Sequence, residues 1–206
     1  MKNPLQYQLS EYDCGPTSLL NAISFLFDRA EIPPELIRNI MLYSLDCYGA
    51  NGDSGKSGTS RAAMTFLSNW LRGYGEVGKL PVFSRYLSGQ QVYLGGDSAI
   101  SDALHRGGVA VVRVFLDEWH YVLLTGERDD LVLVFDPYYG ADFSHHTDIR
   151  IVTDDPCRCN RLVPMHRFNR VQSICYALGA LDSREAVLVY NEATKLTAEK
   201  TIEYFI

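Results

Sequence analysis

The hydrophobic residues that follow the polar start of the chain recur with a helical period. Leucine, isoleucine and phenylalanine at positions 19, 20, 23, 26 and 27 fall on one face of an α-helix. Pro16 suits the first turn of such a helix, where a missing N–H removes no hydrogen bond. The pattern therefore predicts a helix that starts at Cys14 or one residue after it.

Helix caps predict three more helices. Pro33-Pro34 starts the second, over the segment PELIRNIMLYSL. A glycine-rich loop at 49–58 follows it, and Thr59-Ser60 then caps a third helix that runs to about Arg72. Asp97 is expected to cap a short fourth helix.

Runs of β-branched and aromatic residues predict a sheet in the second half of the chain. Helices first and strands afterwards, with short turns between successive strands, indicate an α+β fold with an antiparallel sheet. The strands are expected at Leu80–Tyr86, Val109–Phe115, His120–Thr125, Leu131–Phe135, Val171–Leu178 and Ala186–Tyr190.

The composition is that of a globular domain. The 206 residues are 47% hydrophobic and 21% charged, with 16 glycines and 8 prolines, which excludes a disordered or low-complexity chain. The formal charge is −6. We expect no nucleic-acid partner, because phosphate backbones are bound by clustered basic residues.

The chain has five cysteines, an odd number that does not suit a disulfide framework. Its first residues lack the apolar run of a signal peptide, and no window approaches the length of apolar sequence that spans a membrane. We therefore expect free thiols, a cytoplasmic location and no membrane span.

Cys14 is the thiol best placed for chemistry. The helix dipole and the unpaired N–H groups of a first helical turn favour the thiolate, which is the nucleophilic form. The alternative is a buried structural cysteine, which is the commoner situation for an isolated cysteine.

A base and its orienting group are predicted from hairpin geometry. A short polar turn at 126–130 joins the strands His120–Thr125 and Leu131–Phe135. This turn places His120 opposite Asp136 or the residue after it, with Cβ atoms about 5 Å apart, close enough for a carboxylate to hold an imidazole N–H. The alternative is a surface pair at the end of the sheet.

An oxyanion donor is the fourth part that acyl transfer to a thiolate requires. A side-chain amide shortly before the nucleophile can supply it, together with the nucleophile's own N–H. Gln8 is one candidate, and Gln6 is an equal one on this argument.

Taken together, these residues resemble a known family. The run Gln8-Leu-Ser-Glu-Tyr-Asp-Cys14-Gly-Pro-Thr-Ser-Leu-Leu is similar to the start of papain-like cysteine peptidase family 39, the bacteriocin-processing or double-glycine leader peptidases. His120-Tyr-Val-Leu-Leu and Val134-Phe-Asp136-Pro137 match that family's second half, and Gly58-Thr59-Ser60 looks like a third segment. The resemblance runs, with gaps, from about Gln6 to Gly140.

The resemblance implies a papain-like fold, in which a cysteine-bearing helix packs on an antiparallel sheet. By it, Cys14 is the nucleophile, His120 the general base and then acid, Asp136 its orienting group, and Gln8 the oxyanion donor. The implied function is a cysteine peptidase that hydrolyses a bond of a peptide or extended protein segment through a thioester acyl-enzyme. A related thiol acyltransferase or amidase, and a peptide-binding pseudoenzyme, are the alternatives.

The resemblance also implies a division of the chain. Residues 1–140 form a papain-like peptidase core, and residues 141–206 form a C-terminal extension that we expect to add strands to the same domain. Many relatives are the front domain of an export ATPase, whereas a standalone domain is expected here.

Two further motifs predict other chemistry. The segment 50–57, with Lys56, satisfies a relaxed phosphate-loop pattern, so a nucleotide-binding protein is an alternative from another class. However, the preceding segment reads as a helix rather than a strand, and the expected interpretation is a flexible polar loop. We expect no cofactor. We also expect no metal, because the spacing of the potential zinc ligands does not match that of common zinc sites. These ligands are Cys157, Cys159, His166 and Cys175.

Overall fold

The computed structural model describes residues 1–140, 143 and 145–197. Its elements follow one another along the chain as α1 (Cys14–Leu26), α2 (Pro34–Ser44), α3 (Arg61–Glu76), β1 (Val82–Ser88), α4 (Ala99–His105), β2 (Val109–Leu116), β3 (Glu118–Arg128), β4 (Leu131–Phe135), β5 (Arg150–Ile151), β6 (Arg161–Pro164), α5 (Met165–Phe168) and β7 (Glu185–Asn191), with short 3₁₀ turns at Gly89–Gln91 and Leu181–Ser183.

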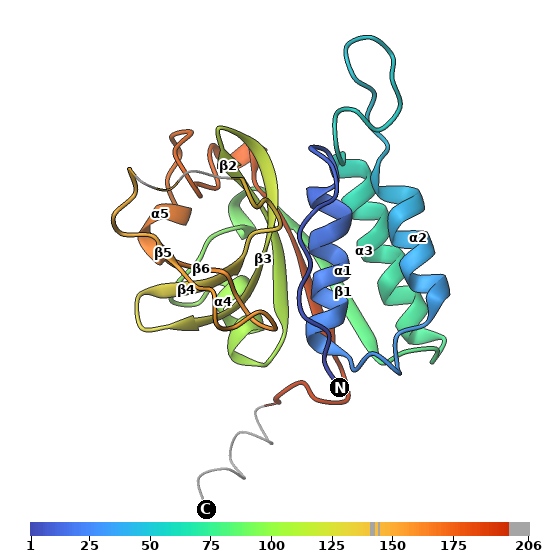
Figure 1. Cartoon of the computed structure of the whole chain (residues 1–206). Helices are drawn as coiled ribbons and strands as arrows, with labels where there is room; N and C mark the ends of the chain where they lie inside the picture. Colours follow the sequence, from blue (N-terminus) through green and yellow to red (C-terminus); the bar gives the residue numbers. More distant parts are fainter. Residues whose placement is uncertain (141–142, 144, 198–206) are drawn as a thin grey trace, which may run out of the picture.

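The strands form one antiparallel sheet in the order β1-β7-β2-β3-β4-β6-β5. Helices α1, α2 and α3 pack on one face, and α4 and α5 pack on the other (Figure 1). The expected α+β class with an antiparallel sheet is confirmed. The last strand, β7, lies between β1 and β2, and β5 and β6 extend the sheet beyond β4.

Helices cover both faces of the sheet, so both faces are buried. Successive residues of a strand point to opposite faces and therefore join different cores. In β2, Val109 and Val111 join the core under α1–α3, while Ala110, Val112 and Val114 join the core under α4 and α5. This explains why β2 reads as a continuous apolar run in the sequence.

Helix α1 begins at Cys14, as its apolar period predicts. It packs against β3 on one side and α2 on the other, so nearly all of its residues are buried. The Ser18 hydroxyl donates to the Tyr121 carbonyl of β3 over 3.0 Å, which fixes the helix against the strand close to His120.

The first turn of α1 is packed tightly against the residue that precedes the cap of α3. A Cβ on Gly15 would lie 2.2 Å from the Thr59 Oγ1 and 2.8 Å from the Thr59 Cβ. Only glycine fits here. Ser60 caps α3 as predicted and accepts from the Ala63 N–H over 3.1 Å, and α3 extends beyond Arg72 to Glu76.

The hairpin register predicted from the sequence is wrong. The strands β3 and β4 pair as far as Arg128 and Leu131, so the turn is two residues long and not the segment 126–130. A bulge between Leu124 and Gly126 then shifts the pairing, and Leu123 faces Phe135. His120 therefore does not lie directly opposite Asp136 in the ladder.

Two other local predictions are corrected. Residues 171–178 form no strand, because their backbone bonds to the end of β2 only at Phe115 and to the end of α5 at Phe168, and not through a ladder. Ser98, not Asp97, caps α4 and accepts from the Ser101 N–H.

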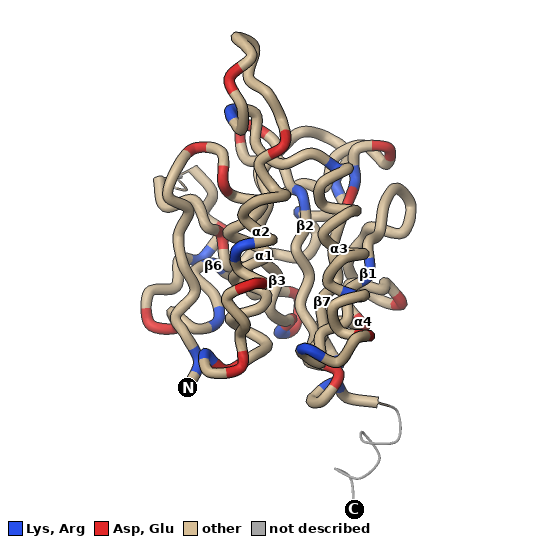
Figure 2. The backbone as a smooth tube through the Cα atoms, turned by 90° about the vertical axis from the view of Figure 1, so that its right-hand side faces the viewer, with Lys and Arg blue, Asp and Glu red and all other residues tan. Residues whose placement is uncertain are grey.

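The loop between α2 and α3 projects from the end of the helical layer (Figure 1). Acidic and basic residues alternate over the described backbone without a continuous basic stripe (Figure 2). No helix of the described chain has both the length and the apolar character needed to cross a membrane.

We predict that Gly15→Ala lowers the free energy of unfolding by about 1–3 kcal/mol, because the added methyl group overlaps Thr59. Denaturant titration measures this. The matched control is Gly73→Ala in α3, where an added Cβ meets no atom within 4 Å, so stability should rise by about 0.5–1 kcal/mol. Equal effects of the two alanines would contradict the packing argument.

Candidate active site

Cys14 lies at the positive end of α1, in its first turn, with a residual exposure of 8%. The N–H groups of Cys14 and Gly15 have no acceptor within the helix, because the first turn lacks carbonyl partners. The thiol and two unused backbone donors therefore occupy the same place.

Asp13, the residue before the thiol, shapes the turn that leads into the helix. Its buried carboxylate accepts from the Leu9 N–H over 2.9 Å and from the Ser10 N–H over 2.6 Å. Burial would raise the pKa of Asp13, but the hydrogen bond from the Ser10 hydroxyl and then the two backbone N–H bonds lower it below its ordinary value. The charged form therefore holds the arm at 8–13 in a fixed path.

His120 and Asp136 are hydrogen-bonded, although the hairpin register from which we predicted their contact is wrong. His120 Nε2 lies 2.8 Å from Asp136 Oδ1, and both side chains are buried. The contact runs diagonally across the ladder, since Asp136 follows the last residue of β4. With Nε2 occupied, Nδ1 is the ring nitrogen left for the Cys14 thiol.

Hydrogen bonds fix both the carboxylate and the backbone of Asp136. Its Oδ1 also accepts from the Tyr138 N–H over 2.9 Å, and its Oδ2 accepts from the Tyr176 hydroxyl over 2.7 Å. Asn160 binds the backbone of Asp136 twice, by its Oδ1 to the N–H and by its Nδ2 to the carbonyl, each over 2.8 Å.

The electrostatics of His120 favour the imidazolium. Burial alone would lower the pKa of His120, but hydrogen bonds with Asp136 and Cys14, and the charges of both, raise it to about 10. The ring therefore keeps its proton at neutral pH while it contacts the thiol. An imidazolium beside a cysteine favours the thiolate.

Gln8 lines the same cavity as Cys14 and His120, and its backbone N–H donates to the Pro137 carbonyl over 2.9 Å. One N–H of its amide donates to the Ser10 carbonyl over 2.7 Å. An amide nitrogen carries two hydrogens, so one remains for a substrate oxygen.

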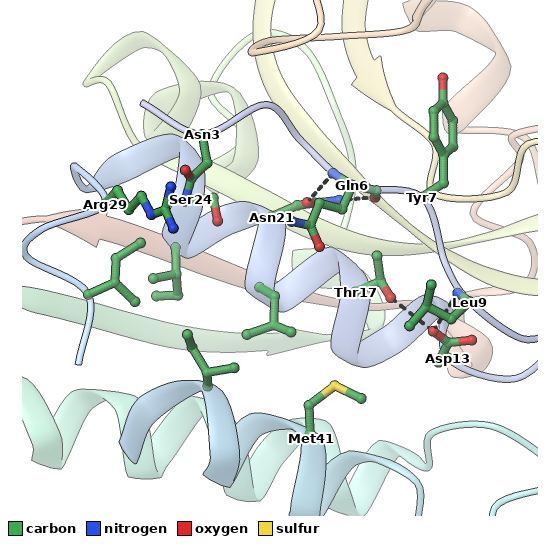
Figure 3. Close-up of a pocket in the computed structure, with 14 residues that line it drawn as sticks. Asn3, Gln6, Tyr7, Leu9, Asp13, Thr17, Asn21, Ser24, Arg29 and Met41 are labelled. Atoms are coloured by element: carbon green, nitrogen blue, oxygen red, sulfur yellow. Dashed lines mark hydrogen bonds between the residues drawn. The ribbon is translucent and has the colours of Figure 1, made fainter. Parts of the chain in front are cut away.

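Gln6, the other candidate, has a different position. Its backbone forms two hydrogen bonds with the Asn21 side chain, and it lines a separate pocket between the N-terminal arm, α1 and α2 (Figure 3). Of the two glutamines, only Gln8 lines the cavity beside Cys14. The structure thus separates two residues that the spacing before Cys14 left as equal candidates.

Two adjoining cavities of about 570 and 490 Å³ meet at Cys14 and share Glu11, Glu118 and Trp119. One extends along Lys56–Thr59 and Arg113, and the other along Gln8 and His120. The thiol therefore lies in the middle of a cleft, with open space on either side.

Three of the other four cysteines are unsuited to nucleophilic attack. Burial raises the pKa of Cys47, Cys159 and Cys175, to about 12 for Cys175. Cys157 is exposed in a loop. In the described part of the chain, no group of three or more His, Cys, Asp or Glu side chains is arranged to hold a metal ion.

The segment 50–57 does not have the setting of a phosphate loop. Helix α2, not a strand, precedes it, and Lys56 pairs with Asp53 over 3.2 Å. Both side chains of this pair are exposed. Lys56 and the residues after it instead border one end of the cleft.

Sequence reasoning missed Asp13, Asn160 and Tyr176. Asp13 directly precedes the thiol, and its residue type at a helix start was a usable signal. Asn160 and Tyr176 lie in a polar stretch and a mispredicted strand, and no local pattern marks either of them. The structure brings both to Asp136 from distant parts of the chain.

Comparison with known proteins adds no assignment. No protein-family model and no curated protein sequence matches the chain.

We predict that iodoacetamide modifies Cys14 faster than exposed Cys157 at mildly acidic pH. The raised pKa of His120 keeps its ring charged throughout that range, and a positive charge beside a cysteine makes it more reactive. Peptide mapping by mass spectrometry gives both rates in one sample. His120→Ala should lower the rate of Cys14 alkylation by about tenfold or more and leave the rate of Cys157 alkylation unchanged. Equal rates for the two thiols in the unmodified protein would refute the ion pair.

Proposed function

We propose that the protein is a papain-like cysteine peptidase that hydrolyses a bond of a peptide or an extended protein segment. The observation that carries the proposal is one cavity lined both by a thiol at a helix start and by an imidazole that a buried carboxylate holds. Support also comes from the layout, a cysteine-bearing helix packed on an antiparallel sheet that supplies histidine and aspartate.

Acylation starts with the Cys14 sulfur attacking a peptide carbonyl carbon. The C–S bond forms, and the carbonyl electron pair moves to the oxygen to give a tetrahedral oxyanion. His120 then gives its proton to the amide nitrogen, so the C–N bond breaks and the amine leaves. The product is a thioester on Cys14 and a neutral His120.

Deacylation uses His120 in the opposite sense. It takes a proton from water as the water oxygen attacks the thioester carbon. Collapse of the second tetrahedral intermediate releases the carboxylic acid and restores the thiolate and the imidazolium. Asp136 stays ionised and keeps the ring oriented in both halves.

The oxyanion is stabilised by donors of this chain. Gln8 and Cys14 both line the cleft, which supports the Cys14 N–H and the second amide hydrogen of Gln8 as these donors. Removal of one such donor typically lowers kcat by about a hundredfold or more. The arm at 8–13, held by Asp13, positions Gln8 for this role.

The mechanism gives the substrate a direction in the cleft. The leaving amine must reach His120, so the segment after the scissile bond occupies the cavity that His120 and Gln8 line. The segment before that bond occupies the cavity along Lys56–Thr59 and Arg113.

Replacing the nucleophile tests the proposed function. Cys14→Ala should lower the cleavage of a mixed peptide library by about 10⁴-fold or more, since no other group can form the thioester. Mass spectrometry in isotopically labelled water detects new carboxyl termini that carry one solvent oxygen. Cys157→Ala is the matched control and should cleave normally. Products joined to an added amine, with no solvent oxygen, would indicate acyl transfer instead of hydrolysis.

The charge of the cleft predicts a substrate preference. Glu11, Asp117 and Glu118 line the His120 side and have no ion-pair partner within the described residues. Peptides with lysine just after the scissile bond should therefore be cleaved about two- to fivefold faster than those with glutamate, as expected for exposed charges. Glu118→Gln and added salt should both reduce this ratio. A ratio that neither change affects would exclude an electrostatic origin.

A further inference from the structure

Tyr176 has a backbone conformation that a large side chain rarely adopts. Among the described non-glycine residues, φ is positive at Asp117, Asp129 and Tyr176. The two aspartates lie in hairpin turns, where this conformation is common. Tyr176 lies in no hairpin, and its φ of 64° is strained for an aromatic residue.

Several contacts maintain this strained conformation. The Tyr176 N–H donates to the Phe115 carbonyl over 2.8 Å, and the Phe115 N–H donates to the Ala177 carbonyl over 2.9 Å. The ring is fully buried and stacks on Phe143 with 5.7 Å between centroids. The result is a rigid aromatic ring whose hydroxyl points at the Asp136 carboxylate.

The hydroxyl is a permanent donor. Burial, followed by the charge of Asp136, raises the pKa of Tyr176 well above its ordinary value, so the phenol stays protonated. Its 2.7 Å bond to Oδ2 leaves Oδ1 to accept from His120. A buried carboxylate without such donors rotates or takes up a proton.

We propose that Tyr176 is a positioning residue, whose hydroxyl fixes Asp136 so that the carboxylate holds the His120 imidazolium beside Cys14. The proposal rests on the proposed cysteine peptidase function. It also assigns a role in that site to the C-terminal extension, because Tyr176 lies far outside the segment that resembles the peptidase family.

Packing alone does not explain this arrangement. A phenylalanine would fill the same volume against Phe143 and make the same backbone contacts, and a residue buried only for its ring has no use for a hydroxyl.

The titratable and charged groups around Tyr176 and Asp136 come from several elements. They are His120 of β3, Cys14 of α1, Arg161 of β6, and Cys175 and Asp136 itself.

The experiment measures the rate of Cys14 alkylation against pH in Tyr176→Phe. Removing the hydroxyl leaves Oδ2 buried with no donor among the described residues, so the carboxylate is free to turn away from His120. An imidazolium that Asp136 no longer holds is less stable beside Cys14, so the acid limit of alkylation should move up by about one to two pH units. Peptide cleavage at mildly acidic pH should fall by about ten- to a hundredfold.

Tyr86→Phe is the matched control. The Tyr86 hydroxyl donates over 2.9 Å to Glu185, a buried carboxylate outside the triad. This variant loses the same kind of bond, and its acid limit should equal that of the unmodified protein. If Tyr176→Phe does not fold, Tyr176→3-fluorotyrosine keeps the shape with a stronger donor, and the acid limit should then move to lower pH.

The outcomes separate this inference from the proposed function. An acid limit that moves in Tyr176→Phe but not in Tyr86→Phe supports the positioning role. Identical limits in all three proteins, with fast His120-dependent alkylation, overturn the inference alone. Slow alkylation of Cys14 in the unmodified protein, unaffected by His120→Ala, overturns both.

Discussion

The buried hydrogen bond between His120 Nε2 and Asp136 Oδ1 is the contact on which the rest of the site depends. Burial works against the charge on both partners, so an ionised pair survives only where other groups compensate for lost water. The chain supplies them as the Tyr138 N–H, the Tyr176 hydroxyl and the Asn160 clamp on the Asp136 backbone. Cys14 shares a cavity with this histidine, whereas burial raises the pKa of three of the other cysteines.

The site is assembled from three segments that are distant in sequence, and backbone hydrogen bonds set their alignment. The Gln8 N–H donates to the Pro137 carbonyl, which joins the N-terminal arm to the residue after Asp136. The Ser18 hydroxyl donates to the Tyr121 carbonyl, which joins α1 to the residue after His120. Cys14, His120 and Gln8 therefore each lie within four residues of a contact with the neighbouring segment, and small shifts of the helix would disturb all of them together.

Local patterns predict α1 to α4 but not the short α5, because caps and apolar periods act over a few residues and α5 is too short to show a period. They also predicted the nearness of His120 and Asp136, though for a partly wrong reason, since the bulge at Leu124–Gly126 depends on long-range packing. The same limit explains the strand wrongly predicted at 171–178. Tyr176, Ala177 and Leu178 are buried without pairing in a ladder, whereas Val171 and Ile174 are exposed, and such a run of apolar residues has the same pattern in the sequence as a strand. Asn160 and Tyr176 act only through residues far along the chain, so no local signal marks them.

The sheet order couples this site to the end of the chain. β7 pairs with β1 and β2, so β2 has a neighbour on both sides only when residues 185–191 are in place. The end of β2 in turn binds the backbone on both sides of the strained Tyr176, and that strain is sustained only by a well-fixed strand. The Tyr176 hydroxyl in turn donates to the Asp136 carboxylate and orients it. The geometry at Cys14 thus depends on a strand that is about 170 residues away in sequence, and the C-terminal part is a structural requirement of the site rather than an appendage to it.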